Sequence, residues 1–298
     1  MTRPSFLRRS GVIACAAIAF TVVATAACAG TEETTPVVDY ESYVALGDSF
    51  TAGPGIPPQI EGDPCGRSAS NYPTLVAAEL GIEDFVDASC GAATSLDFAM
   101  SQTTFRGGTV PPQYDSLRPD TELVTVGIGG NDIGLVQLAL GCVNLSAPPE
   151  GASCAITNTP DGTDRVDAAI DAFAPTYTTV IDEIRRRSPD ARIVLVGYPT
   201  GIRDGGCFPD QRIWPEDATY LQEKIDRLNT VMREQAEAAE ADYVDLRSSS
   251  RDHDACADPE DRWMAGLQPA AGSIPLHPNA AGHRNAADQV LAAITDRS

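Results

Sequence analysis

The chain has 298 residues, of which 43% are hydrophobic, so it is long enough and apolar enough to bury a sizeable core. Acidic residues number 42 against 21 Lys and Arg, and the formal net charge is therefore −21. A surface this acidic repels nucleic acids and anionic lipid headgroups. The composition thus argues against a polyanion-binding role, and we expect no nucleic-acid partner.

The first 27 residues have the features of an export signal. Three arginines and no acid precede an apolar run from Gly11 to Ala27. The run ends at Cys28, which is compatible with a bacterial lipobox in which Cys28 carries a lipid, and also with ordinary cleavage after Ala27 or with retention of the run as a membrane anchor. We expect residues 1–27 to be a signal peptide. The mature protein would then be secreted, either free outside the cell or anchored to the outer face of the cell membrane as a lipoprotein.

The rest of the chain is expected to be one domain behind a short linker. Residues 28–39 are polar and acidic, which is typical of a flexible tether. Residues 40–298 contain no segment that resembles an interdomain linker, and their length fits a single large α/β domain. No apolar run in this part is long enough to span a bilayer.

Six cysteines remain outside the signal and its end, after Cys15 and Cys28 are set aside. An even number in an exported chain favours disulfides over a metal site, especially since no C-x-x-C pair occurs. Six cysteines allow fifteen pairings. The simplest pairing joins neighbours along the chain: Cys65–Cys90, Cys142–Cys154 and Cys207–Cys256.

Short runs rich in β-branched residues alternate with long segments in which apolar residues recur at helical spacing. This rhythm predicts a parallel sheet covered by helices on both faces. In chain order we expect strand Tyr43–Gly47, helix Tyr72–Leu80, strand Asp84–Ala88, strand Leu123–Ile128, helix Arg165–Arg187, strand Arg192–Val196, helix Glu216–Ala239, strand Tyr243–Leu246 and helix Asn279–Ile294.

The segment Gly47-Asp48-Ser49 follows the first expected strand and ends it in small residues. A strand that ends in this way lets a serine hydroxyl and its own backbone N–H project past the edge of the sheet. Such a serine is typical of a nucleophile for acyl transfer. On its own, however, a Gly-Asp-Ser sequence is more often an ordinary turn.

Two further motifs follow later strands and are expected at the same edge of the sheet. Gly91 comes after the second strand, and Gly130-Asn131 comes after the third. An oxyanion hole needs rigid donors that converge on one point. The backbone N–H groups of Ser49 and Gly91 and the side-chain amide of Asn131 would supply three. Taken singly, either motif is a glycine turn, with Asn131 as a local cap.

A serine nucleophile needs a base, and the chain contains three histidines. His277 precedes the last helix and is followed by a proline, so we expect it on a loop. His283 lies inside that helix and is expected to be a packed residue, while His253 is expected to pair with the adjacent Asp252 and Asp254. His277 and His283 are six positions apart and lack the helical spacing of a zinc motif. His277 is therefore the candidate base.

The serine, glycine, asparagine and histidine motifs occur in the order found in SGNH/GDSL hydrolases, and the chain resembles this family over nearly all of its mature length. Ser49, Gly91, Asn131 and His277 match the four blocks. The cysteine pattern resembles that of secreted actinobacterial lipases and esterases with three disulfides. The resemblance implies a three-layer α/β/α, flavodoxin-like fold with a central parallel sheet of about five strands.

The resemblance also implies an activity and the residues that perform it. It implies a carboxylic ester hydrolase in which Ser49 is the nucleophile and His277 is the general base and then the general acid. Ser49, Gly91 and Asn131 would be the oxyanion donors. Neither a metal nor an organic cofactor is implied.

The family usually has an aspartate three residues before the histidine, where this chain has Ile274. We expect the backbone carbonyl of Ile274, or of a close neighbour, to accept a hydrogen bond from the proton-bearing nitrogen of His277. A carbonyl fixes the imidazole tautomer without burying a second charge.

The expected substrate is a lipid ester or a short-chain acyl ester. The chain is expected to be a monomer that touches a membrane only through an N-terminal lipid. Aromatic and sulfur-containing side chains in long loops are candidates for an acyl groove: Phe208, Trp214, Trp263 and Met264. The alternative enzyme is a carbohydrate O-deacetylase with a polar sugar cleft. The alternative outside enzymes is a non-catalytic envelope lipoprotein, which has no physical reason to keep a nucleophile and a base together.

Overall fold

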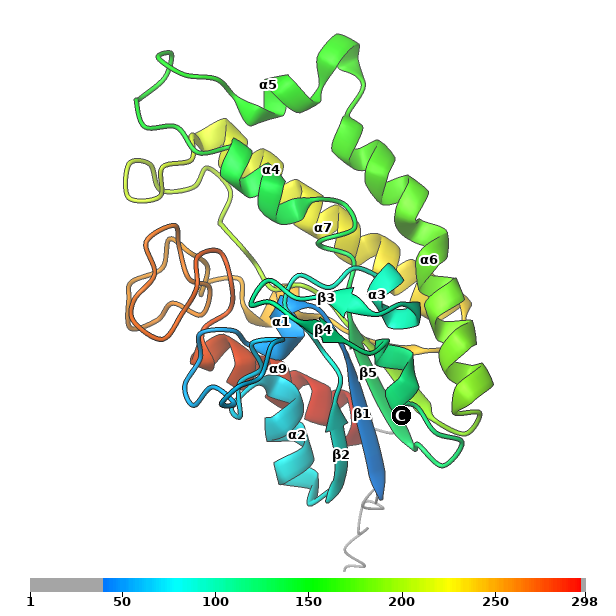
Figure 1. Ribbon diagram of the computed structural model, residues 1–298. Helices are drawn as coiled ribbons and strands as arrows, with labels where there is room; N and C mark the ends of the chain where they lie inside the picture. Colours follow the sequence, from blue (N-terminus) through cyan, green and yellow to red (C-terminus); the bar gives the residue numbers. More distant parts are fainter. Residues whose placement is uncertain (1–39, 296–298) are drawn as a thin grey trace, which may run out of the picture. The chain divides into compact units, whose positions relative to one another are not determined.

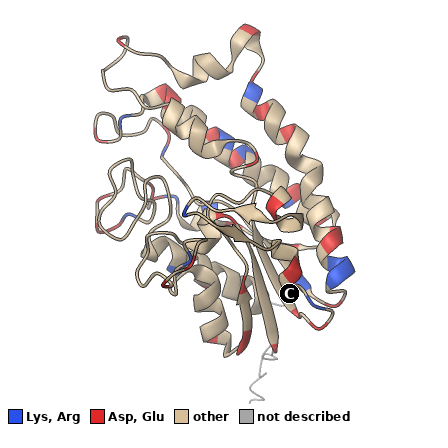
Figure 2. Ribbon diagram, in the orientation of Figure 1, with Lys and Arg blue, Asp and Glu red and all other residues tan. Residues whose placement is uncertain are grey.

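The computed structural model describes residues 40–295. The expected signal peptide (1–27), the expected tether (28–39) and Cys28 lie outside the described residues. Among the residues described, no helix combines the length and apolar character needed to cross a bilayer. Acidic residues, red in the ribbon of Figure 2, are spread over many elements, including helices, loops and the ends of strands.

A five-stranded parallel sheet forms the centre of the described chain, with the strand order β2-β1-β5-β6-β7. Its strands are β1 (Ser42–Gly47), β2 (Asp84–Asp87), β5 (Leu123–Gly127), β6 (Arg192–Val196) and β7 (Asp242–Val244). All residues of β1 and β5 are buried, which is typical of central strands that helices cover on both faces.

Alternate residues of β1 point into two separate apolar cores. Val44 and Leu46 pack in one core with side chains from α6 (Arg165–Arg187) and α7 (Pro215–Ala238). Tyr43 and Ala45 pack in the other core with side chains from α2 (Tyr72–Leu80) and α9 (Ala280–Thr295). Figure 1 shows these two helix pairs on opposite sides of the sheet. The predicted three-layer α/β/α architecture with five strands is confirmed.

Shorter elements lie in the connections, and the sequence pattern did not reveal them. They are α1 (Ser49–Ala52), α3 (Leu96–Ala99), β3 (Gln102–Thr103), β4 (Thr109–Val110), α4 (Leu135–Gly141), α5 (Cys154–Asn158), α8 (Leu246–Ser249) and the 3-10 turns Gln113–Ser116 and Pro160–Gly162. Elements this short do not complete enough turns or alternations to show a hydrophobic period.

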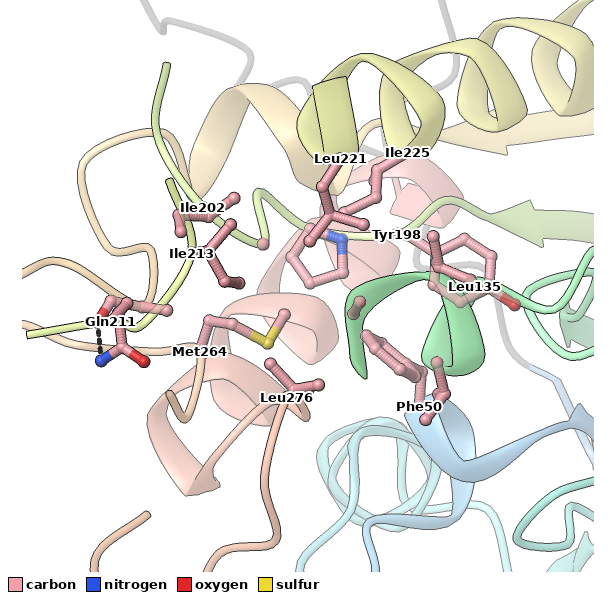
Figure 3. Close-up of a pocket in the computed structure, with 15 residues that line it drawn as sticks. Phe50, Leu135, Tyr198, Ile202, Gln211, Ile213, Leu221, Ile225, Met264 and Leu276 are labelled. Atoms are coloured by element: carbon pink, nitrogen blue, oxygen red, sulfur yellow. Dashed lines mark hydrogen bonds between the residues drawn. The ribbon is translucent and has the colours of Figure 1, made fainter. Parts of the chain in front are cut away.

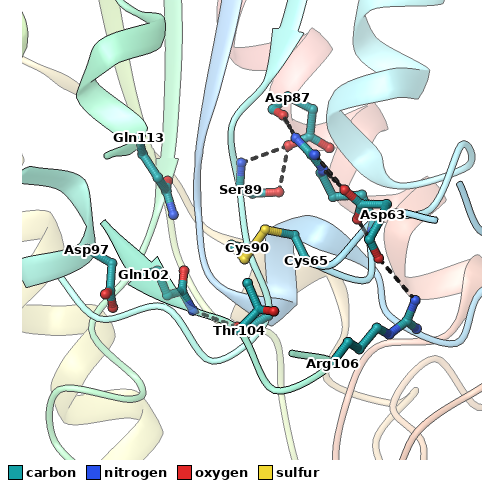
Figure 4. The surroundings of a disulfide bond; sticks show 12 residues. Asp63, Cys65, Asp87, Ser89, Cys90, Asp97, Gln102, Thr104, Arg106 and Gln113 are labelled. Atoms are coloured by element: carbon teal, nitrogen blue, oxygen red, sulfur yellow. Dashed lines mark hydrogen bonds and ion pairs between the residues drawn. A yellow bond between two sulfur atoms is a disulfide. The ribbon is translucent and has the colours of Figure 1, made fainter. Parts of the chain in front are cut away.

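Three disulfides join loops that follow strand ends or short helices, and they have the simplest of the fifteen pairings. Cys65–Cys90 ties the connection after α1 to the loop after β2 (Figure 4). Cys142–Cys154 joins the end of α4 to the start of α5. Cys207–Cys256 joins the loop after β6 to the loop after α8.

The last residue of β1 allows α1 to pack directly against the sheet. Gly47 pairs in register with Gly127 at the end of β5. A Cβ atom on Gly47 would lie 2.2 Å from Thr51 Oγ1 and 2.7 Å from the carbonyl oxygen of Gly127. Thr51 belongs to α1, so the absence of a side chain at Gly47 determines how closely α1 approaches the strand ends.

We expect Gly47→Ala to lower the free energy of unfolding by about 2–3 kcal/mol, because the added methyl group must displace both the backbone of β5 and the side chain of Thr51. Urea unfolding followed by circular dichroism measures this change. Gly141→Ala is the matched control, since a Cβ atom at Gly141 meets no atom within 4 Å. The control is expected to be unchanged or more stable by up to about 1 kcal/mol. Equal stability of both variants would contradict the role given to Gly47.

Candidate active site

Ser49 is the first residue of α1, directly after the end of β1. The side chain of Asp48 caps this helix, and its Oδ1 atom accepts a hydrogen bond from the Phe50 N–H at 2.8 Å. Ser49 is buried, with 8% of its surface exposed. Its own backbone N–H has no hydrogen-bond partner among the described residues, so it is available to a bound substrate.

His277 lies against Ser49 although 228 positions separate them in the sequence. The distance between His277 Nε2 and Ser49 Oγ is 2.7 Å. On its other side, His277 Nδ1 lies 2.8 Å from the carbonyl oxygen of Pro275. A carbonyl only accepts, so Nδ1 carries the proton and Nε2 is free to accept the serine O–H. Burial lowers the pKa of His277, and the Pro275 carbonyl partly opposes that shift.

The carbonyl that faces His277 Nδ1 belongs to Pro275, the residue after Ile274, whereas the expectation named Ile274 or a close neighbour. Leu276 has a φ of 60°, a left-handed conformation that is rare for a non-glycine residue. This conformation turns the chain between Pro275 and His277, so that the carbonyl two residues before the imidazole faces it. The side chain of Ile274 packs beside Gly55 instead, where a Cβ atom would meet it at 3.0 Å.

Asn131 and Gly91 lie in neighbouring loops after β5 and β2. Asn131 Nδ2 donates a hydrogen bond to the carbonyl of Ala93 at 2.8 Å, which ties the two loops together and leaves a second N–H on the amide. The Gly91 N–H donates to the carbonyl of Cys65 at 2.9 Å. The N–H that was expected to be an oxyanion donor is therefore hydrogen-bonded within the protein. The disulfide between Cys65 and Cys90 holds that carbonyl beside Gly91 (Figure 4).

Gly91 has a packing role that its sequence motif did not indicate. A Cβ atom at this position would lie 2.5 Å from Cε1 of Phe105 and 3.0 Å from the Cys65 carbonyl oxygen. The next residue, Ala92, has a φ of 63°. Its N–H has no hydrogen-bond partner among the described residues, and the residue is exposed. A non-glycine residue in this conformation beside a candidate site is a strained position of the kind that functional loops contain.

The other two histidines lie outside the candidate catalytic pair. His283 is buried in α9 as expected, and its Nδ1 accepts a hydrogen bond from the Tyr72 N–H at 3.1 Å. Burial, with a smaller contribution from His277, lowers the pKa of His283 to about 3. His253 stacks on Trp263 with ring centres 3.6 Å apart. Its Nδ1 lies 2.5 Å from the carbonyl oxygen of Asp261, so the expected pairing with Asp252 and Asp254 is not found.

An apolar cavity of about 50 Å³ lies among the loops and helices at this end of the sheet (Figure 3). Its walls include Phe50 and Leu276, the chain neighbours of Ser49 and His277. Further walls come from the loop after β6 and from α4, α7 and the 255–264 region: Leu135, Val136, Ala139, Tyr198, Pro199, Gly201, Ile202, Gln211, Ile213, Leu221, Ile225, Ala255 and Met264. Met264 was an expected lining residue. Trp214, in contrast, packs away from the cavity, and its Nε1 donates to the carbonyl of Ser146.

Comparison with known proteins places these features in a family. The chain matches the model of the GDSL-like Lipase/Acylhydrolase family over residues 45–284. The chain belongs to this family. It is 34% identical to Lipase 2 of Streptomyces coelicolor over 303 aligned positions, with 98% of each chain covered. It is 30% identical to an esterase of Streptomyces scabiei, with 83% of this chain and 84% of the relative covered.

A solved structure agrees with the fold and with the family. The crystal structure of phospholipase A1 from Streptomyces albidoflavus NA297 superposes with a TM-score of 0.70 and 25% sequence identity, covering 85% of this chain and 99% of that chain. Together with the family match, these similarities identify the chain as an ester-cleaving hydrolase. Within residues 40–295, no three His, Cys, Asp or Glu side chains gather in an arrangement that would hold a metal ion.

The lowered pKa of the buried His283 makes the folding stability of this hydrolase depend on pH. Its pKa is lowered in the folded state, so below about pH 6.5 the unfolded chain binds a proton that the folded chain does not bind until about pH 3. Folding stability is therefore lost as the pH falls through this window, by up to about 1.4 kcal/mol per pH unit. We expect His283→Gln to flatten this dependence.

Urea unfolding of both proteins between pH 7 and pH 4 measures the difference in slope. The contribution of His277, whose pKa is also lowered, is common to both proteins and cancels in the comparison. Parallel stability curves for the wild type and His283→Gln would show that His283 does not resist protonation in the folded state.

Proposed function

We propose that this chain hydrolyses carboxylic esters through an acyl-enzyme intermediate on Ser49, with His277 as the general base. The observation that carries the proposal is the 2.7 Å contact between Ser49 Oγ and His277 Nε2, combined with the Nδ1 contact to Pro275 that fixes the tautomer. This is the geometry that proton transfer from a serine hydroxyl requires.

In the first half of the reaction, Ser49 Oγ attacks the ester carbonyl while its proton moves to His277 Nε2. The imidazolium that forms donates from Nδ1 to the Pro275 carbonyl and from Nε2 to the leaving alkoxide. In the second half, His277 takes a proton from water, the hydroxide attacks the acyl carbonyl, and the proton returns to Ser49. Because burial lowers the pKa of His277, its imidazole is neutral at neutral pH and can accept the proton of the serine hydroxyl.

The negative charge on the tetrahedral oxygen needs converging donors. Ser49 offers its free N–H at the start of α1, and Asn131 offers the N–H of its amide that does not bind Ala93. We assign the third donor to the Ala92 N–H in place of Gly91. The left-handed conformation of Ala92 and its unpaired N–H support this assignment, because the strain is then compensated by a role in binding the oxyanion.

The acyl group of the substrate would occupy the apolar cavity beside Phe50 and Leu276. This supports lipid or short-chain acyl esters over sugar acetates, since a deacetylase site needs polar side chains where this cavity has aliphatic ones. The similarity to proteins named Lipase 2 and phospholipase A1 supports the same substrate class.

We further propose an exported monomer made of one hydrolase domain, residues 40–298. The three disulfides support an oxidising location outside the cell. Residues 1–27 would be the signal peptide, and residues 28–39 the tether. Lipidation of Cys28 would hold the domain at the outer face of the membrane, and the acidic composition supports the absence of a nucleic-acid partner.

We expect Ser49→Ala and His277→Ala each to lower kcat by several orders of magnitude, because each removes a group that makes or breaks a bond. Hydrolysis of p-nitrophenyl acetate, butyrate, octanoate and palmitate by the purified mature domain measures the rates. Ser248→Ala is the matched control, since the Ser248 hydroxyl is exposed and pairs with Asp245. Full activity of Ser49→Ala would refute the nucleophile assignment. If the wild type hydrolysed none of the four esters but cleaved sugar acetates, the result would favour the carbohydrate O-deacetylase.

Filling the cavity should shorten the preferred acyl chain. Ala139 lies in α4 and is buried at the cavity wall. We expect Ala139→Leu to lower kcat/KM for the octanoate ester by about 10-fold or more while acetate hydrolysis stays within about 3-fold, because the added carbons occupy the acyl space. Leu140→Ala, on the exposed face of the same helix, is the control and should leave the chain-length profile unchanged. A uniform loss across chain lengths in Ala139→Leu would argue against this acyl site.

A further inference from the structure

Tyr198 connects the segment that carries the nucleophile to the loop that carries Asn131. It follows β6 at the same edge of the sheet as Ser49 and is almost fully buried. Its hydroxyl lies 2.5 Å from Asp48 Oδ2 and accepts a hydrogen bond from the Gly130 N–H at 2.8 Å. Asp48 immediately precedes Ser49, and Gly130 immediately precedes Asn131.

The direction of each hydrogen bond in this connection is defined. The Gly130 N–H can only donate, so the single proton of the Tyr198 hydroxyl is directed to the Asp48 carboxylate. Burial raises the pKa of Tyr198 well above its usual value, which keeps that proton on the phenol. The other oxygen of Asp48 accepts the Phe50 N–H at 2.8 Å. The chain of bonds therefore runs without interruption from the first turn of α1 to the Asn131 loop.

Both the backbone and the ring of Tyr198 are held in place. Its backbone N–H donates to Asn229 Oδ1 at 2.7 Å, and its carbonyl accepts from Asn229 Nδ2 at 2.8 Å, so α7 fixes the backbone. The ring packs edge-on against Phe50, with ring centres 5.0 Å apart. A Cβ atom on Gly130 would lie 3.0 Å from the hydroxyl, so a glycine there gives the phenol close access to the backbone.

We propose that Tyr198 is a positioning residue that fixes the oxyanion loop relative to the nucleophile. It acts through Asp48 on one side and Gly130 on the other, while its ring forms part of the acyl cavity. The proposal rests on the proposed function, because it takes Ser49 as the nucleophile and Asn131 as an oxyanion donor. A displacement of either donor by about 1 Å lowers the rate of such reactions by about 100-fold.

Tyr198→Phe tests the proposal, since it removes the hydroxyl and keeps the ring in the cavity. We expect kcat for p-nitrophenyl butyrate to fall by about 10- to 100-fold, with KM within about 3-fold and the acyl-chain preference unchanged. Tyr43→Phe is the matched control. It removes another buried hydroxyl, which lies 2.7 Å from Thr125 Oγ1 within the sheet, and it should change stability without changing kcat.

The pH profile gives a second readout that a merely structural role would not move. Burial raises the pKa of Asp48 to about 7, and the hydrogen bond from Tyr198 opposes that rise. The negative charge of Asp132 also raises the pKa of Asp48. Because Asp48 acts through the Tyr198 hydroxyl, its protonation lowers the rate only while that hydroxyl is present, so in Tyr198→Phe the acid limb of kcat/KM should move to lower pH, where His277, whose pKa is lowered by burial, sets it. Asp48→Asn should lose kcat to a similar extent, and the double variant should be no worse than Asp48→Asn alone.

Three results would overturn the proposal: a kcat of Tyr198→Phe within 3-fold of the wild type, an equal loss in Tyr43→Phe, or additive losses in the double variant. If Tyr198→Phe does not fold, Asp48→Asn alone tests the proposal: a loss of kcat with little change in KM supports it, and an unchanged kcat overturns it. Active Ser49→Ala enzyme would show that the proposed function has failed. Inactive Ser49→Ala together with an unimpaired Tyr198→Phe would show that only this inference has failed.

Discussion

Four neighbouring parallel strands end at the same edge of the sheet, and the arrangement of the site depends on that shared edge. In the order β2, β1, β5 and β6, the loops after these strands carry Ala92, Ser49, Asn131 and Tyr198. The carboxyl ends of parallel strands meet at one edge of a sheet, so the backbone hydrogen bonds of the sheet bring together four segments that are distant in sequence. The ends of β1 and β5 are both glycines, paired as Gly47 and Gly127, which lets α1 lie directly on the strand ends. The proposed oxyanion donors thus follow the ends of strands that include the fully buried β1 and β5.

His277 is the exception, because it reaches the site from a loop before α9 and not from a strand of the sheet. Backbone hydrogen bonds pair this loop with an earlier one: the Ala265 N–H donates to the His277 carbonyl at 2.8 Å, and the Leu276 N–H donates to the Ala265 carbonyl at 3.1 Å. The carbonyl that orients the imidazole belongs to the same paired loop. One backbone arrangement therefore sets both the position and the tautomer of the base. A carbonyl stabilises the imidazolium less than a carboxylate would, but it avoids the desolvation cost of a second buried charge beside the serine.

Most of the fold was predictable from the sequence because its long elements carry clear hydrophobic periods. Helices Tyr72–Leu80 and Arg165–Arg187 and strand Arg192–Val196 have the predicted bounds, and the other four strands differ from the prediction only at their ends. Two details of the site depend on single backbone dihedral angles. Non-glycine residues with positive φ, Ala92 and Leu276, determine which N–H and which carbonyl face the site, and no residue type in the sequence marks them. Tyr198 gave no signal either, since a tyrosine after a buried strand is an ordinary core residue until its partners Asp48 and Gly130 are known.

The proposed acyl cavity and the proposed catalytic residues share part of their structure, which affects how specificity can be changed. Phe50 is bonded to Ser49, Leu276 is bonded to His277, and the ring of Tyr198 belongs to the side chain that binds Asp48; all three line the cavity. A change in the size of any of these three side chains is therefore expected to alter kcat together with chain-length preference. Ile213 and Ile225 line the same cavity from other elements and have no such connection. Acyl-chain selectivity in this hydrolase is therefore separable from catalysis only through the walls that are distant from Ser49 and His277 along the chain.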